Sequence, residues 1–163
     1  MVGDIEIYTD GSCKKFADVT FGGWAYIILV ENQLFRYESD GEVDSTNQRM
    51  ELTAAIKGLE YATQMNVRDS DIILYSDSAY LINCVKQEWY KKWIRNGWRN
   101  SKNEPVANQD LWQQLLPFFK NPRCIFRHVL GHNNNFFNEK CDKLAQDAAA
   151  KLKYNWKGYK NEE

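Results

Sequence analysis

The sequence lacks the features that mark several large classes of protein. Its 21 Lys and Arg residues nearly balance its 22 Asp and Glu residues, so no overall basic field points to nucleic acid and any such signal must be local. The four cysteines form no C-x-x-C pair, which argues against a zinc site or a disulfide framework and favours reduced thiols. No apolar run approaches the roughly 20 residues that cross a bilayer, and the first residues do not resemble a secretory signal. We therefore expect a cytoplasmic protein without a membrane span.

What remains is the composition of one ordinary globular domain, with 44% hydrophobic and 26% charged residues in 163. The chain has no internal repeat, low-complexity stretch or linker. Hydrophobic periodicity predicts strands and helices in a definite order. They are three strands (4–10, 22–30, 33–43), a helix (45–65), a strand (72–75), three helices (78–87, 88–99, 108–119), a strand (123–130) and a helix (138–153). This order predicts a mixed sheet with helices packed on its faces.

The fourth predicted strand ends in a way that a core strand rarely does. Its apolar run, 72–75, is followed by Ser76 and then by a carboxylate, Asp77. In open α/β sheets, ligands bind beyond the carboxyl ends of the parallel strands, which favours a ligand-binding role for Asp77. Asp is also a common helix N-cap, so capping of the next helix is an equally good explanation.

A second carboxylate, Asp10, closes the first predicted strand in "YTDGSC". If the first and fourth strands are neighbours, Asp10 and Asp77 lie side by side. Two carboxylates about 4 Å apart repel by roughly 4 kcal/mol at an effective dielectric of 20. A shared proton or a bound cation would relieve that repulsion. The strand pairing thus predicts a site that attracts protons or metal ions.

Two further acidic residues could complete this set. Glu51 lies early in the 45–65 helix and Asp142 lies in the last helix, although each alone also fits a solvated helix charge. Carboxylate oxygens without a neighbouring Cys/His cluster suit Mg²⁺ or Mn²⁺ better than Zn²⁺.

Taken together and in this order, the motifs closely resemble type 1 ribonuclease H of the bacterial kind. The matching segments are "YTDGSC", "TNQRMELTAAI", "SDSAYL", "KKWIRNGWR", "NQDLW", the Gly-His pair at 131–132 and "NEKCDKLA". The resemblance implies an α/β fold of the ribonuclease H type, with a five-stranded mixed sheet whose strands 1–3 are antiparallel, flanked by helices. It also implies a catalytic domain over residues 1–150, followed by a basic C-terminal tail over 151–163.

The same resemblance implies an endonuclease that hydrolyses the RNA strand of RNA–DNA hybrids and leaves 3′-hydroxyl and 5′-phosphate ends. Its catalytic and metal-binding carboxylates would be Asp10, Glu51, Asp77 and Asp142. They would hold two Mg²⁺ ions, for which Mn²⁺ could substitute, as in two-metal nucleases. His132 matches a family histidine that assists proton transfer or product release, a role suited to a near-neutral imidazole. We expect a monomer.

Nucleic-acid contacts are expected from a local basic and aromatic segment and from the start of the 45–65 helix. The candidate contact residues are Lys86, Trp89, Lys91, Lys92, Arg95, Trp98, Arg99, Asn47 and Gln48. Lysine and arginine give phosphate affinity without sequence readout, and polar groups in the minor groove can read the 2′-hydroxyl of RNA. An amphipathic helix whose tryptophans are simply packed down would explain part of the same pattern. The segment 14–23 departs from the glycine- and proline-rich turn of many bacterial members, and Lys14 and Lys15 could contact phosphate there.

Two other functions are compatible with the fold. One is a DNA-cutting nuclease of the integrase or resolvase kind, against which "TNQRMEL" and the basic aromatic helix argue. The other is a catalytically inactive nucleic-acid-binding module, against which the presence of all four acidic residues argues.

Overall fold

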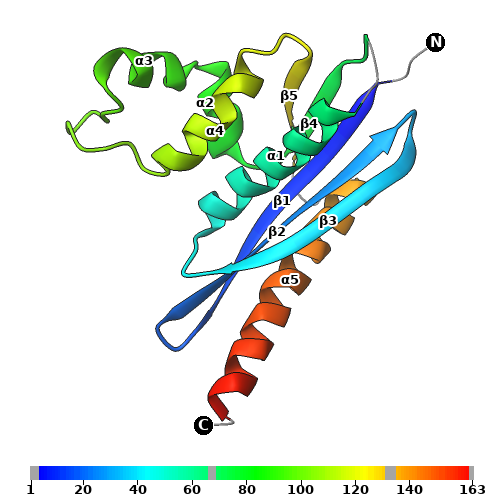
Figure 1. The fold of residues 1–163 in the computed structure, drawn as a ribbon, viewed down its shortest axis with the longest axis vertical. Coiled ribbons are helices and arrows are strands. Elements are labelled where there is room, and N and C mark those ends of the chain that lie inside the picture. The colour runs from blue at the N-terminus through cyan, green and yellow to red at the C-terminus, as the bar shows by residue number, and fades with distance from the viewer. Residues whose placement is uncertain (1–3, 66–68, 131–134, 162–163) are drawn as a thin grey trace.

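The chain forms one five-stranded mixed sheet in the order β3-β2-β1-β4-β5 (Figure 1). The structure is a computed structural model that describes residues 4–65, 69–130 and 135–161. The strands are β1 (Ile5–Phe16), β2 (Val19–Val30), β3 (Gln33–Val43), β4 (Ile72–Ser76) and β5 (Cys124–His128). β1, β2 and β3 are antiparallel, whereas β4 is parallel to both β1 and β5. The predicted fold class and the pairing of the first and fourth strands are therefore confirmed.

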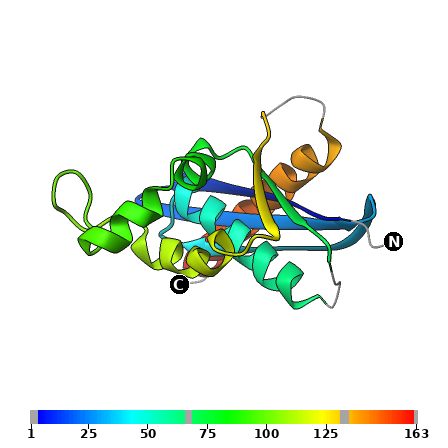
Figure 2. The same ribbon diagram turned by 90° about the horizontal axis from the view of Figure 1, so that it is seen from above.

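Helices cover both faces of this sheet (Figure 2). They are α1 (Asn47–Gln64), α2 (Ala79–Lys86), α3 (Trp89–Asn96), α4 (Gln109–Phe119) and α5 (Phe136–Asn161). Alternate residues of β1 point to opposite faces, as the two-residue period of a strand requires. Ile7 belongs to the larger core under α1, whereas Tyr8 belongs to the smaller core under α5. None of the described helices is both long enough and apolar enough to cross a membrane.

Local sequence explains where α1 begins and how it packs. Thr46 is its N-cap, and the Thr46 side chain accepts a hydrogen bond of 3.1 Å from the backbone N–H of Arg49. The predicted apolar face is buried, since Leu52 and Leu59 are fully enclosed. This helix packs on β1 and β2 and so fixes the position of its first turns relative to the sheet.

β1 is longer than the sequence predicts. The prediction ended the strand at Asp10, but β1 continues to Phe16 and pairs with β2 up to Val19. β4 ends at Ser76, and its pairing with β1 reaches only Tyr8. Asp10 therefore lies in the middle of its strand, at the point where the neighbouring strand stops.

α5 is also longer than predicted, because it runs from Phe136 through residue 150 and on to Asn161. The added turns pack on the sheet: Trp156 lies edge-on to Phe21, with ring centroids 6.1 Å apart. The division into a domain over 1–150 and a tail over 151–163 stays a prediction, and the described part of that tail is helical.

Gly23 is the place where α5 approaches the sheet most tightly, which gives a first testable prediction. A Cβ atom on Gly23 would collide with the backbone oxygen of Ala145 and lie 2.6 Å from the backbone nitrogen of Ala149. Since both atoms belong to helix backbone, Gly23→Ala must push α5 away from β2. We expect a loss of about 3 kcal/mol in the free energy of unfolding, measured by urea denaturation. An unchanged unfolding midpoint for Gly23→Ala would contradict the close approach.

Candidate active site

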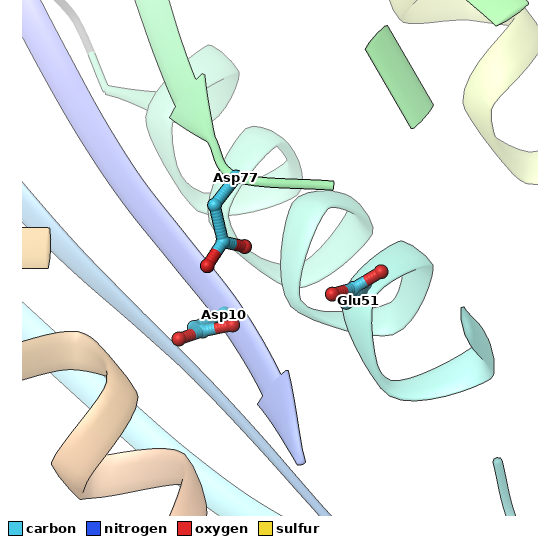
Figure 3. Close-up of side chains that lie close together, drawn as sticks. All are labelled: Asp10, Glu51 and Asp77. Atoms are coloured by element: carbon cyan, nitrogen blue, oxygen red, sulfur yellow. The ribbon is translucent and has the colours of Figure 1, made fainter. Parts of the chain in front are cut away.

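Three carboxylates from distant parts of the sequence meet where β4 ends. One oxygen from each of Asp10, Glu51 and Asp77 lies within 4.8 Å of the others. Figure 3 shows the three side chains pointing toward one another from β1, α1 and the end of β4. The structure thus brings together three of the four carboxylates that the sequence analysis selected.

The residue after Asp10 makes this convergence sterically possible. A Cβ atom on Gly11 would collide with the backbone nitrogen of Glu51 and lie 2.5 Å from the backbone carbonyl carbon of Met50. Only glycine therefore lets the first turns of α1 approach β1 here, and that approach carries Glu51 to Asp10. The backbone N–H of Gly11 also donates a 2.8 Å hydrogen bond to Oδ1 of Asp10, which orients the carboxylate.

Asp77 does not cap the helix that follows it. The N-cap of α2 is Ser78, whose hydroxyl accepts a 3.1 Å hydrogen bond from the backbone N–H of Leu81. Ser76 accepts a 3.0 Å hydrogen bond from the N–H of Ser78 and so shapes the turn between strand and helix. The capping explanation for Asp77 is wrong, and its side chain lies with Asp10 and Glu51 instead.

Burial and mutual repulsion strongly favour the protonated form of this cluster. The Asp10 side chain is buried, and that burial together with the charge of Asp77 raises the pKa of Asp10 to about 9. Burial also raises the pKa of Glu51 to about 7, with a smaller contribution from Asp77. Oδ2 of Asp10 is buried and receives no hydrogen bond from the described residues. A divalent cation would satisfy this oxygen and remove the repulsion, so the donor set fits a hard metal ion.

The fourth predicted carboxylate adjoins the other three. Asp142 lies on α5, and its carboxyl group is close enough to Asp10 to add to the rise in the pKa of Asp10, after the larger effects of burial and Asp77. Gln146, one turn further along α5, donates a 2.9 Å hydrogen bond to Oδ2 of Asp142. Asp142 is therefore next to Asp10 but outside the tight group of three.

Two polar residues beside these carboxylates were not selected from the sequence. Ser78 forms a side-chain hydrogen bond that lowers the pKa of Glu51. Asn138 precedes Asp142 by one turn of α5, is 4% exposed, and its Oδ1 accepts no hydrogen bond from the described residues. The spacing of four between Asn138 and Asp142 places both on one face of a helix, and this is the signal that could have identified Asn138.

The two histidines of the chain differ in what the structure describes. His132, the predicted catalytic histidine, lies outside the described residues, and its role stays a prediction. His128 lies at the end of β5, with Nε2 3.3 Å from the backbone oxygen of Asp77.

The basic aromatic segment separates its two kinds of side chain. Its cationic residues Lys86, Lys91, Lys92, Arg95 and Arg99 are all exposed. Its tryptophans are half-buried, and the ring of Trp93 contacts Trp89, Trp98 and Trp112 at centroid distances of 6.3, 5.8 and 5.5 Å. The aromatics thus anchor α3 and the turn after it, while the positive charges face solvent.

The start of α1 is held in place beside the carboxylates. Asn47 and Gln48 are exposed in its first turn, a few residues before Glu51. Arg49 forms a bidentate ion pair with Asp110, with distances of 3.0 and 2.8 Å, and this pair ties α1 to the start of α4. A paired guanidinium of this kind is geometrically specific, so it fixes the orientation in which α1 presents these polar residues.

Comparison with solved structures defines the class to which this fold belongs. The crystal structure of LC9-RNase H1, a type 1 ribonuclease H with the type 2 active-site motif, superposes with a TM-score of 0.76 at 23% identity, covering 92% of this chain and 74% of that one. Ribonuclease H1 of Halobacterium salinarum superposes with a TM-score of 0.61 at 21% identity, covering 90% and 97%. The sheet and its flanking helices are those of the ribonuclease H fold.

Sequence comparison narrows the class to a family. The RNase H family model matches residues 3–150. The ribonuclease H of Syntrophomonas wolfei is 42% identical over 149 residues, which is 91% of this chain and 98% of the relative. The ribonuclease H of Moorella thermoacetica is 41% identical over 151 residues, covering 92% and 94%. The chain belongs to the ribonuclease H family, and its acidic cluster is consistent with a metal-dependent active site.

Proposed function

We propose that this ribonuclease H cuts the RNA strand of RNA–DNA hybrids at the cluster of Asp10, Glu51 and Asp77, leaving 3′-hydroxyl and 5′-phosphate ends. The observation that carries the proposal is the approach of three carboxylates to within 4.8 Å of one another, with a buried Asp10 oxygen that receives no hydrogen bond from the described residues. Such an arrangement is unfavourable without a cation.

The ligands proposed for the metal are Asp10, Glu51, Asp77 and the adjoining Asp142. Asp10 lies close to Asp77 and Asp142, and these carboxylates would hold two ions, with Mg²⁺ as the expected metal and Mn²⁺ as a substitute. Divalent ions held there supply an activated water and neutralise charge on the leaving 3′-oxygen. Gly11 orients Asp10 by its N–H, Ser78 hydrogen-bonds Glu51 and Gln146 hydrogen-bonds Asp142, so three of the ligands are positioned by neighbouring groups.

The hybrid would lie over the carboxylates with its minor groove toward the start of α1. Asn47 and Gln48 are exposed there and can donate to or accept from a 2′-hydroxyl, which DNA lacks. The fold is shared with a foamy viral protease–reverse transcriptase whose structure contains an RNA/DNA hybrid (TM-score 0.70, 22% identity, 90% of this chain and 20% of that one). The exposed cations of α3 and its flanks would contact phosphates of the DNA strand.

Two residues are proposed to assist the chemistry without holding metal. His132 would accept or deliver a proton during product departure. Asn138 would orient either Asp142 or the scissile phosphate through its buried amide.

Cleavage of three end-labelled duplexes, with and without Mg²⁺, tests the proposed function. We expect the RNA strand of the hybrid to be cut only with Mg²⁺, and all-DNA and all-RNA duplexes to stay intact. Cutting of the all-DNA duplex would favour the integrase- or resolvase-like alternative. Tight hybrid binding without any cleavage would favour an inactive binding module.

Removing two exposed charges of α3 should weaken hybrid binding through phosphate contacts alone. Lys92→Ala with Arg95→Ala is the chosen pair, because Lys91 already forms an ion pair with Glu88. We expect the slope of log affinity against log salt to fall by about 2 and kcat to change little. Lys57→Ala with Lys120→Ala removes the same charge from exposed positions elsewhere. Equal slopes for the two double variants would show that α3 does not face the hybrid.

Three expectations about the whole protein stay predictions. They are a monomeric state, a cytoplasmic location and the division at residue 150. Analytical ultracentrifugation checks the first directly.

A further inference from the structure

The part of the fold that departs most from the sequence expectation lies beyond the carboxylates. The β1–β2 hairpin extends six residues past Asp10, to Phe16, and α5 extends past residue 150, where the family model ends. The Syntrophomonas relative is matched over 98% of its length by 149 residues of this chain. The last turns of α5 are therefore an addition to what the family model describes.

These two extensions pack on each other. Trp156 lies edge-on to Phe21 of β2, and Nζ of Lys153 lies 5.6 Å from the ring centroid of Phe16 at the tip of the hairpin. An isolated two-stranded hairpin is marginally stable in water, so contacts with a helix of this kind are what hold its tip in place. The added turns of α5 thus make the hairpin a fixed projection.

The projection carries lysines that no acidic partner neutralises in the described part of the chain. Lys14 and Lys15 are consecutive on β1, so Lys14 points to the face that carries α5 and Lys153, whereas Lys15 points to the other face of the hairpin. None of the three takes part in an ion pair among the described residues. The nearest acidic residue in sequence, Asp18, lies in the turn of the hairpin. Asp44 also adjoins the hairpin, because its backbone N–H donates a 2.8 Å hydrogen bond to Thr20. Three lysines against these two acidic residues still give the projection a net positive charge in a chain whose total is −1.

The projection is continuous with the active site. Lys14 follows Asp10 by four strand residues, about 14 Å at roughly 3.4 Å per residue. Lys153 follows Asp142 by eleven helical residues, about 16 Å at 1.5 Å per residue. Because β4 stops beside Asp10, the outer edge of β1 leads from the carboxylates to these lysines with no strand paired on it in the described chain. In Figure 1, β1 carries the hairpin to the lower left end of the sheet, while α3 lies at the upper left, on the side of β4 and β5.

We propose that Lys14, Lys15 and Lys153 form a second phosphate-binding arm, which holds the hybrid on the side of the carboxylates away from α3. This inference rests on the proposed function, since its ligand is the same hybrid. At about 3.4 Å of axis per nucleotide, the arm reaches phosphates about four or five nucleotides from the cut. The hybrid would then be held at both ends of the site, by α3 on one side and by this arm on the other.

Equilibrium binding of an RNA–DNA hybrid in EDTA tests the arm without any dependence on cleavage. We expect Lys14→Ala with Lys15→Ala to lower hybrid affinity about tenfold at low salt and to reduce the salt slope by about 2. Lys153→Ala alone should reduce the slope by about 1. Lys57→Ala with Lys120→Ala, and Lys57→Ala alone, are the charge-matched controls.

A second measurement separates a binding role from a structural one. Lys14→Gln with Lys15→Gln keeps side-chain length while removing charge, so it should reproduce the loss of affinity with an unchanged thermal unfolding midpoint. Salt slopes equal to those of the controls would overturn the arm, even in an enzyme that cuts the hybrid normally. If the lysine variants reduce the slope of log hybrid affinity against log salt, but the wild-type protein does not cut the hybrid, the arm would be supported and the proposed function refuted.

Discussion

Replacing Asp10 with asparagine is expected to lower the rate of hybrid cleavage by at least about 10³-fold, equivalent to roughly 4 kcal/mol of transition-state stabilisation. The substitution keeps the shape of the side chain and the 2.8 Å hydrogen bond from Gly11, but it removes the charge at the centre of the cluster. Asp10 is the carboxylate that is close to both Asp77 and Asp142, so we expect no other carboxylate to take over its position. The hybrid should still bind, because the contacts proposed for its phosphates are made by lysines and arginines and not by Asp10.

Single-turnover cleavage and hybrid binding in EDTA, measured on the same protein preparation, separate these two effects. Asp71→Asn is the matched control, since Asp71 is exposed and lies just before β4. We expect the control to cleave at the wild-type rate. Full activity of the Asp10→Asn variant would remove Asp10 from the mechanism, and loss of binding together with activity would place Asp10 in hybrid recognition instead.

The convergence of the carboxylates could be predicted because it depends on local sequence patterns, namely an apolar strand and an amphipathic helix with its cap. The apolar run of β4 identified a buried strand, and the hypothesis that it neighbours the first strand followed from the carboxylates at the ends of the two strands. Pairing with β1 then brought Asp10 and Asp77 together, as the structure confirms. The apolar face and the capping residues of α1 were likewise visible, so the position of Glu51 early in that helix was predictable.

The lengths of β1 and α5 could not be predicted because they depend on tertiary contacts. The predicted strand ended at Asp10, but "DGSCKKF" is held as a strand by pairing with β2. The end of α5 is polar and lysine-rich, and its helical form is supported by the packing of Trp156 on Phe21. The role of Gly11 was only partly visible: a close backbone approach was conceivable, but its partner, the backbone of Glu51, depends on how α1 crosses the sheet.

The protonation of the cluster gives the second large expected effect, which concerns the protein without divalent ions. The pKa of Asp10 is raised from 3.8 to about 9 and that of Glu51 from 4.5 to about 7, chiefly by burial. For each residue, at a pH between its unfolded and its folded pKa, the folded chain holds a proton that the unfolded chain has released. The free energy of unfolding must therefore fall as the pH rises, beginning above about pH 4 and levelling only above about pH 9. Each proton contributes a slope of at most about 1.4 kcal/mol per pH unit.

Urea denaturation in EDTA from about pH 5 to pH 9 measures this slope. Asp10→Asn should flatten it and make the metal-free protein more stable than wild type at about pH 8, although the same variant is inactive. Asp71→Asn, at an exposed position, should leave the slope unchanged.

Metal ions should oppose the loss of wild-type stability at high pH. Binding requires the carboxylates to release their protons, and the bound ions then cancel the repulsion among them. Adding Mg²⁺ or Mn²⁺ is expected to raise the unfolding midpoint more at about pH 8 than at about pH 6. Calorimetric titration in two buffers of different ionisation enthalpy should show proton release on binding that declines toward about pH 9. A metal-free stability that is flat across this range, or binding that releases no protons near neutral pH, would show that the carboxylates are already ionised and held apart by other means. The cluster would then be an ordinary set of solvated charges, and Asp10→Asn would gain no stability over the wild type.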